Sequence, residues 1–197
     1  MKKQHLFRTS LMLVIVLSTA LISCKKDKDD TPAPSRNTQL SEKILNEIPA
    51  DIIKEANKLG LKINGGVNAP NIEGEYFASP VLLKNSNIEE DQDNIGEITN
   101  DGVFKFSEQN SSNQTILTYI KELNVSDDIG MGSLISGEGD LFTVFVVLEN
   151  MYDSEVAYFL ISGEVAEDGI KDFEFMLARD SGEARVFKDK DGLAERR

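Results

Sequence analysis

The spacing of hydrophobic residues changes once along the chain, from a helical period to a strand period. Between Ser41 and Gly60 the apolar residues recur at steps of three and four: Ile44, Leu45, Ile48, Ile52, Ala56 and Leu59. Ser41 can cap the first turn, and Pro49 can open a second helix because its missing N–H costs nothing in a first turn. Gly60 is a typical stop signal. The sequence therefore predicts a short helical segment whose apolar stripe packs on the domain that follows.

From Ile72 onward apolar and polar residues alternate, which is the period of a half-buried strand. The alternating stretches are 76–83, 103–106, 116–123, 131–135, 141–148, 158–161, 173–177 and 185–187. Clusters of Asn, Asp, Ser and Gly between them predict turns. Eight short strands with short connections favour a mainly β fold, an antiparallel up-and-down barrel, with a β-sandwich as the alternative.

Stretch 141–148 differs from the others because it is apolar on both faces. Leu141, Phe145 and Val147 alternate with Phe142, Val144, Val146 and Leu148. One face can line the barrel while the other receives the helical stripe. An eight-stranded barrel is just wide enough to be filled by side chains or to hold one small molecule. The nine phenylalanines from Phe77 onward suit either outcome, so the sequence leaves open whether the interior is packed or forms a pocket.

The N-terminal stretch is organised as a secretory signal. Three basic residues, Lys2, Lys3 and Arg8, precede an apolar run over 11–22. That run is about the length of a signal h-region and shorter than the roughly 20 residues that span a bilayer. We therefore expect residues 1–23 to be a signal peptide.

The signal ends in the lipobox sequence Leu-Ile-Ser-Cys over 21–24. It resembles the lipoproteins whose signal is cut between Ser23 and Cys24. The resemblance implies that Cys24 carries a diacylglycerol thioether and usually an acylated amine, of the palmitate class. Two or three acyl chains hold a protein on a membrane far more firmly than one. The alternative is a plain secretory signal with an incidental cysteine.

Five segments are expected along the chain: 1–23 signal peptide, 24–39 flexible tether, 40–66 helical lead-in, 67–190 barrel and 191–197 C-terminal tail. The tether is charged and then rich in proline, with no apolar periodicity. Its Lys/Asp-rich start, 25–30, is similar to the export signals of surface lipoproteins in the Bacteroidota. We therefore expect an outer-membrane anchor at the cell surface, with a periplasm-facing anchor as the alternative.

Composition excludes several kinds of chemistry. Cys24 is the only cysteine and His5 the only histidine, and His5 leaves with the signal peptide. Histidine-based catalysis, a cysteine nucleophile and thiolate or imidazole metal sites are therefore excluded in the mature domain. Catalysis would have to rest on carboxylates alone, and nothing distinguishes any pair of them. We expect no enzyme, no catalytic residues and no cofactor.

The charge balance is strongly acidic. Removing the three basic residues of the signal leaves 18 basic against 34 acidic residues, a net charge of −16. Such a surface repels phosphate backbones, so nucleic acid is not an expected partner.

Two acidic clusters are candidates for a calcium-binding loop, 89–94 and 189–192. In the cluster over 89–94, Asp91, Asp93 and the nearby Gly96 match the first, third and sixth positions of an EF-hand loop. Ile95 and Gly102 stand where the fifth and twelfth ligands belong. The cluster over 189–192 ends too soon. Both are expected to be solvated loops, and no metal site is predicted.

A family resemblance lies in the stretches 69–76, 79–80, 83–86, 132–137 and 142–145. These stretches resemble a group of uncharacterised Bacteroidota surface lipoproteins with a lipocalin-like (calycin-like) barrel. Gly74-Glu75-Tyr76 stands where a lipocalin carries Gly-x-Trp on its first strand, with tyrosine in place of tryptophan. The resemblance implies location and shape and carries no activity.

Three functions fit these observations. The first is a binding protein that carries a small apolar or amphipathic ligand in the barrel, with its ligand-binding residues unidentified. The second is an interaction or accessory module of an outer-membrane uptake complex, with an envelope protein as partner. The third is a carbohydrate-capturing surface protein, with one or more of its four tyrosines as stacking rings: Tyr76, Tyr119, Tyr152 and Tyr158.

Overall fold

The computed structural model describes residues 39–122, 129–152 and 155–197. The expected signal peptide, the cleavage and lipidation site at Ser23 and Cys24, and the tether up to residue 38 lie outside the described residues. Two short helices open the described part, α1 (Glu42–Glu47) and α2 (Ala50–Lys58). A 3₁₀ helix, η1 (Glu89–Asn94), follows the third strand.

The strands lie close to where the alternation predicted them, and most are longer. They are β1 (Val67–Asn68), β2 (Gly74–Ala78), β3 (Val81–Ser86), β4 (Gly102–Asn110), β5 (Thr115–Glu122), β6 (Ile129–Glu138), β7 (Leu141–Tyr152), β8 (Glu155–Val165), β9 (Gly169–Arg179), β10 (Ala184–Asp189) and β11 (Leu193–Arg196). Consecutive strands from β4 to β10 pair antiparallel as hairpins. The short β1 pairs parallel with β6.

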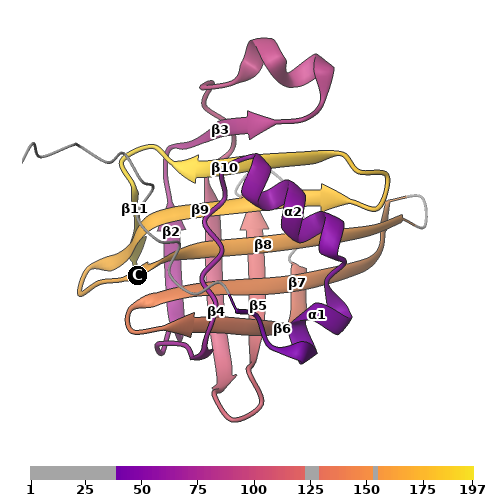
Figure 1. The fold of residues 1–197 in the computed structure, drawn as a ribbon. Coiled ribbons are helices and arrows are strands. Elements are labelled where there is room, and N and C mark those ends of the chain that lie inside the picture. Colours follow the sequence, from indigo (N-terminus) through magenta and orange to yellow (C-terminus); the bar gives the residue numbers. More distant parts are fainter. Residues whose placement is uncertain (1–38, 123–128, 153–154) are drawn as a thin grey trace, which may run out of the picture. The chain divides into compact units, whose positions relative to one another are not determined.

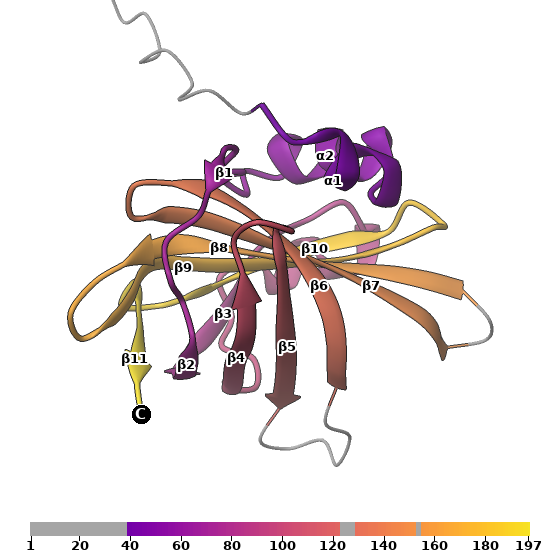
Figure 2. The ribbon, with the colours of Figure 1, turned by 90° about the horizontal axis from the view of Figure 1, so that it is seen from below.

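The sheet closes on itself. β11 pairs with β9 on one side and β2 on the other, while β10 pairs with β3. Segments β2–β3 and β10–β11 therefore act as two interrupted strands, and the described residues form a closed eight-stranded antiparallel barrel (Figure 1, Figure 2). This confirms the predicted barrel, which is consistent with a lipocalin-like fold, and it rules out the β-sandwich alternative.

The predicted C-terminal tail, 191–197, is wrong. Leu193–Arg196 is the closing strand β11, and Ala194 is buried in the barrel. This strand has only four residues, Leu-Ala-Glu-Arg, and is too short to show an alternation in sequence. The pairing with β2 and β9 decides their conformation.

Asp189 holds both interrupted strands where they break. Its carboxylate accepts hydrogen bonds from the N–H groups of Ser79 (2.9 Å), Asp191 (2.9 Å) and Leu193 (3.2 Å). The N–H of Lys190 donates to the carbonyl of Pro80. The side chain is only 1% exposed, so the predicted solvated loop at 189–192 begins with a buried structural carboxylate.

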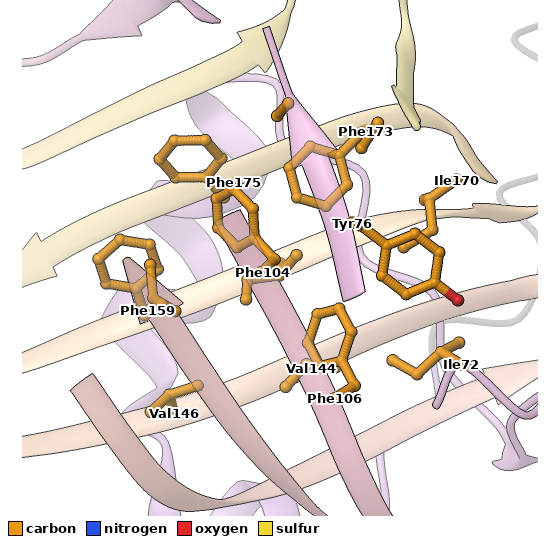
Figure 3. Packing of buried hydrophobic residues seen from close by; sticks show 14 of the residues in the cluster. Ile72, Tyr76, Phe104, Phe106, Val144, Val146, Phe159, Ile170, Phe173 and Phe175 are labelled. Atoms are coloured by element: carbon orange, nitrogen blue, oxygen red, sulfur yellow. The ribbon is translucent and has the colours of Figure 1, made fainter. Parts of the chain in front are cut away.

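The barrel interior is packed with apolar side chains. Tyr76, Phe104, Phe106, Phe142 and Phe173 are fully buried there. Figure 3 shows the labelled rings, among them Phe104 and Phe173, pointing toward one another from different strands. Ring centroids lie 4.8 Å apart for Phe104 and Phe173, and 5.2 Å apart for Phe104 and Phe175. Such tilted and edge-on arrangements are the favoured ones for aromatic pairs. Among the described residues, these contacts favour a packed interior over an open pocket.

The helical lead-in covers the outer face of β7 to β10 (Figure 1). Ile44, Ile48, Ile52 and Ala56 form one buried cluster with residues of that face, among them Phe145. Phe142, Val144, Val146 and Leu148 belong to the interior cluster instead. Stretch 141–148 therefore packs on both sides, as its two apolar faces predicted.

The ends of the two helices follow the predicted punctuation, except at Ser41. Pro49 occupies the N-cap position of α2, one residue before the predicted first turn, and Gly60 adopts a positive φ of 85° just after the helix. The Leu61 N–H donates to the Ala56 carbonyl and the Gly60 N–H to the Asn57 carbonyl, which is the Schellman arrangement. Ser41 occupies the N-cap position of α1, but its side chain forms no capping hydrogen bond.

Candidate functional site

A groove of about 350 Å³ lies on the outer face of the barrel, beside the end of α1. Strands β4 to β7 and the helix end contribute its lining residues, which are Glu47, Ile48, Glu108, Thr115, Ile116, Leu117, Gly132, Ser133, Leu134, Phe145 and Val147. Its volume lies at the lower end of the range of small-molecule sites.

The groove is open because a glycine stands in its floor. Leu117 pairs with Gly132, and Leu134 pairs with Phe145, so outward-facing apolar residues surround a position without a side chain. A Cβ placed on Gly132 would meet nothing within 4 Å. Helix α1 ends at the groove with Glu47 and Ile48, and Ile48 shares a buried cluster with Phe145. Leu117 and Leu134 are only half-buried.

A β-bulge places Glu108 at the groove. The register of β4 against β5 shifts between Ser107 and Asn110, and Glu108 has a left-handed φ of 52°. Gln109 supports this conformation: its amide nitrogen donates to the Pro70 carbonyl (2.7 Å) and its amide oxygen accepts from the Ile72 N–H (2.9 Å). Bulges redirect side chains in this way near binding sites, and a non-glycine residue at positive φ is strained.

Two carboxylates give the groove a negative rim. Glu47 comes from α1 and Glu108 from β4, and in the described part of the chain neither forms a salt bridge. Lys43, one helical turn before Glu47, donates instead to the Asn113 carbonyl at 2.7 Å. The groove therefore combines an apolar floor with two carboxylates that a positively charged group can approach.

The predicted stacking tyrosines separate into buried and exposed ones. Tyr76 is 1% exposed, in the barrel core, and Tyr158 is 6% exposed, beneath the helices. The Tyr158 hydroxyl donates to the Asp180 carboxylate at 3.0 Å. Burial and then this hydrogen bond raise the pKa of Tyr158 to about 12. Tyr119 is 42% exposed, and the side chain of Tyr152 lies outside the described residues. Tyr76 and Tyr158 are therefore not stacking platforms.

Within the described residues, one carboxylate of each acidic cluster has a structural role, Asp91 in the first and Asp189 in the second. Asp91 pairs with the Arg185 guanidinium (2.6 and 3.1 Å) and accepts from the Ser86 hydroxyl (2.7 Å). The hydrogen bond from Arg185 lowers the pKa of the Asp91 carboxyl below its usual value. No three acidic, histidine or cysteine side chains among the described residues are arranged to hold a metal ion.

Sequence reasoning missed the groove. The alternation of apolar and polar residues does not single out Gly132 or Glu108 as a site residue. Glu108 lies next to the polar turn at 110–113, and a glycine within a strand has no side chain that would indicate a site. Ligand-binding residues could not be assigned because they depend on strand register.

Within the described residues no helix is long and apolar enough to cross a membrane. The chain matches no protein-family model, and no curated protein or solved structure shows significant similarity to it.

Proposed function

We propose that this protein is a lipid-anchored lipoprotein of the cell envelope that binds a small amphipathic molecule with a cationic group. The single observation that carries the binding role is the outer groove, where an apolar floor lies beside the carboxylates of Glu47 and Glu108. An apolar tail would cover Leu117, Leu134 and Val147, and an ammonium or guanidinium group would pair with the carboxylates. The lipobox ending at Cys24 supports the anchoring.

The packing of the core favours the outer groove over the barrel interior as the ligand site. Interior phenylalanines contact one another across the barrel, and displacing one such ring costs roughly 3–5 kcal/mol. The groove needs no such displacement, because Gly132 leaves it open. A ligand there is bound between the sheet and the end of α1.

Binding is tested by native mass spectrometry on residues 39–197, which contain both buried clusters. The protein is exposed to a lipid and metabolite extract of its source cells. The decisive variant is Gly132→Leu, which fills the groove with a side chain that meets no neighbour at its Cβ. Gly132→Ala is the matched control, because it makes the same backbone change and leaves most of the groove open.

We expect a discrete added mass on the wild-type protein and on Gly132→Ala, and its loss from Gly132→Leu. An added mass retained by Gly132→Leu would contradict the groove as the site. The absence of any added mass on the wild type would argue against a small ligand and favour a protein partner in the envelope.

The charge preference is tested with octylammonium and octanol, two probes with the same apolar chain. The wild-type protein should bind the ammonium probe more tightly, and the preference should fall in Glu47→Gln and Glu108→Gln. Added salt should reduce the same preference, since exposed ion pairs are screened within about 10 Å at 0.1 M. Equal binding of both probes would mean that the two carboxylates do not contribute to binding and that only the apolar floor does.

Anchoring is tested separately from binding. Metabolic labelling with an alkyne analogue of palmitate should mark the wild-type chain and not Cys24→Ala, which should also leave the membrane fraction. Protease added to intact cells should cleave the anchored protein if it faces outward. Protection in intact cells and cleavage after outer-membrane disruption would place it on the periplasmic side.

A further inference from the structure

The groove beside α1 continues along the outer face of β4 and β5, which pair side by side (Figure 2). On both strands, residues of the barrel core alternate with residues that face outward. The core positions are Phe104, Phe106, Ile116 and Ile120. The outward positions between and beside them are Lys105, Ser107, Leu117 and Tyr119.

Strand register brings a second hollow next to the groove. Leu117 lines the groove, and two residues further along β5 Tyr119 lines a hollow of about 280 Å³. Residues two apart on one strand face are separated by only about 7 Å. Ser107 stands opposite Leu117, and Lys105 stands opposite Tyr119. The two hollows are therefore neighbours along the same two strands, with a small serine and a half-buried leucine between them.

The two ends of this path carry opposite charges. Glu47 and Glu108 lie at the groove end, and Lys105 lies in the second hollow. Lys105 is exposed, and in the described part of the chain it forms no hydrogen bond or salt bridge. Lys121 lines the second hollow too, but it already has an interaction partner. The cation that a ligand can approach here is thus Lys105, with Glu75 directly opposite it on β2 as a competing carboxylate.

The separation of the charges selects a length of ligand. Glu108 and Lys105 are three residues apart on β4, which is about 10 Å along an extended strand. A linear chain of about eight carbons bridges a similar length, since each C–C bond is about 1.5 Å long and advances somewhat less along an extended chain. We propose that the site takes a linear amphiphile with a cationic group at one end and a carboxylate at the other. Its ammonium pairs with Glu47 and Glu108, its methylenes cover Leu117, and its carboxylate pairs with Lys105.

This inference rests on the proposed function and names its ligand class. An exposed ion pair changes an affinity only by roughly two- to fivefold. Without a cation at the far end, a second charge on the ligand would be unfavourable, because the chain carries a net charge of −13. Lys105 therefore decides whether the carboxylate raises or lowers the affinity of the ligand.

The experiment uses the full chain in lipid nanodiscs and measures binding by calorimetry, with the heat on empty nanodiscs subtracted. The probes are ω-aminooctanoate and octylammonium, which share the chain and the ammonium group and differ in the carboxylate. Wild-type protein should bind ω-aminooctanoate about two- to fivefold more tightly than octylammonium. ω-Aminobutanoate carries both charges on a chain too short to join them, and it should bind several-fold more weakly than ω-aminooctanoate.

Two variants should shift the ratio of the two affinities in opposite directions. Lys105→Gln should reverse the order, so that octylammonium binds more tightly than ω-aminooctanoate. Glu75→Gln removes the competing carboxylate and should enlarge the advantage of ω-aminooctanoate. Lys54→Gln, which removes an exposed lysine from α2, is the matched control and should leave the ratio unchanged. Because each result compares two probes on one variant, it does not depend on the fraction of folded protein.

The same data separate this inference from the proposed function. Equal affinity of the two probes on the wild type, or an advantage of ω-aminooctanoate that survives in Lys105→Gln, would overturn the inference while octylammonium binding still supports the groove. Binding of ω-aminobutanoate as tight as that of ω-aminooctanoate would overturn it as well. Absence of octylammonium binding on the wild type would contradict the proposed function, and this inference with it.

Discussion

The buried carboxylate of Asp189 accepts a hydrogen bond from the Ser79 N–H across the seam where the barrel closes, at 2.9 Å. Ser79 lies in the break between β2 and β3, and Asp189 ends β10 before β11 begins. One side chain therefore fixes the two breaks relative to each other. A backbone hydrogen bond from the Lys190 N–H to the Pro80 carbonyl joins the same two breaks, and Asp189 adds the side-chain link.

Asp189→Ala should destabilise the fold by about 2–4 kcal/mol, because three backbone N–H groups lose their buried acceptor. Asp189→Asn should cost less, since an amide oxygen can keep the bonds from Asp191 and Leu193. Urea unfolding measures both. Asp191→Ala, an exposed neighbour, is the control and should stay within about 0.5 kcal/mol of the wild type.

Tyr158→Phe should change how stability depends on alkaline pH. The pKa of Tyr158 is raised to about 12, above the value of about 10 for an unfolded chain. The stability that Tyr158 contributes is therefore fully present below pH 10 and is lost as pH rises through 12. Between these values the wild type should lose about 2–3 kcal/mol more than the variant does.

Near neutral pH, Tyr158→Phe should lower the free energy of unfolding by about 1 kcal/mol, because the hydrogen bond to Asp180 is lost. Tyr119→Phe, at an exposed position, is the control for the alkaline experiment. Parallel stability curves for the wild type and Tyr158→Phe above pH 10 would refute the assignment.

Asp91→Asn should weaken the attachment of η1 to β10. It should also remove a contribution to the free energy of unfolding that is lost at acidic pH. The Asp91 pKa lies below its ordinary value of 3.8 because Arg185 donates two hydrogen bonds to it. Its contribution is present above pH 3.8 and is lost as pH falls through the lower value in the folded protein. We expect the variant to be about 1 kcal/mol less stable at pH 6. This difference should disappear below the folded-state pKa.

Guanidinium unfolding would be confounded by ionic strength, so urea titrations at pH 2 to 7 are the suitable measurement. Asp93→Asn changes an exposed carboxylate in the same 3₁₀ helix and should stay within about 0.5 kcal/mol of the wild-type stability at pH 6. A similar loss of stability in both variants would mean that the ion pair between Asp91 and Arg185 does not cause the loss.

Glu108→Gly should separate stability from binding. A left-handed φ of 52° costs a side-chain-bearing residue roughly 1–2 kcal/mol, while glycine adds about 0.5–1 kcal/mol of unfolded-state entropy. The variant should therefore be as stable as the wild type or up to about 1 kcal/mol more stable. Its affinity for octylammonium should fall, because one carboxylate of the groove is gone.

The neighbouring variant Ser107→Gly is the control for this pair of measurements. Ser107 does not have a positive φ, so glycine there should destabilise by about 0.5–1 kcal/mol. Thermal melting and probe binding on both variants give the comparison. A stability loss in Glu108→Gly as large as that in Ser107→Gly would show that the bulge is not strained.

Local patterns in the sequence determined the elements and the layers of this protein. The helical stripe ends at Gly60 and the strands alternate from Ile72 because periods of 3.6 and 2 are properties of the backbone itself. The two apolar faces of 141–148 predicted both the core and the helix contact, since a strand buried on both sides must be apolar on both. The absence of histidine beyond His5 and of cysteine beyond Cys24 limited the possible chemistry in the same direct way.

Tertiary structure alone decided the barrel closure and the candidate sites. Leu193–Arg196 is a strand only because β2 and β9 pair with it, and Ser41 leaves its cap bond unmade. The groove beside α1 depends on Gly132 standing opposite Leu117 and on a bulge that turns Glu108 outward. Register and bulges are set by contacts between residues far apart in sequence. No local pattern can encode them, because shifting a strand by one residue exchanges its two faces.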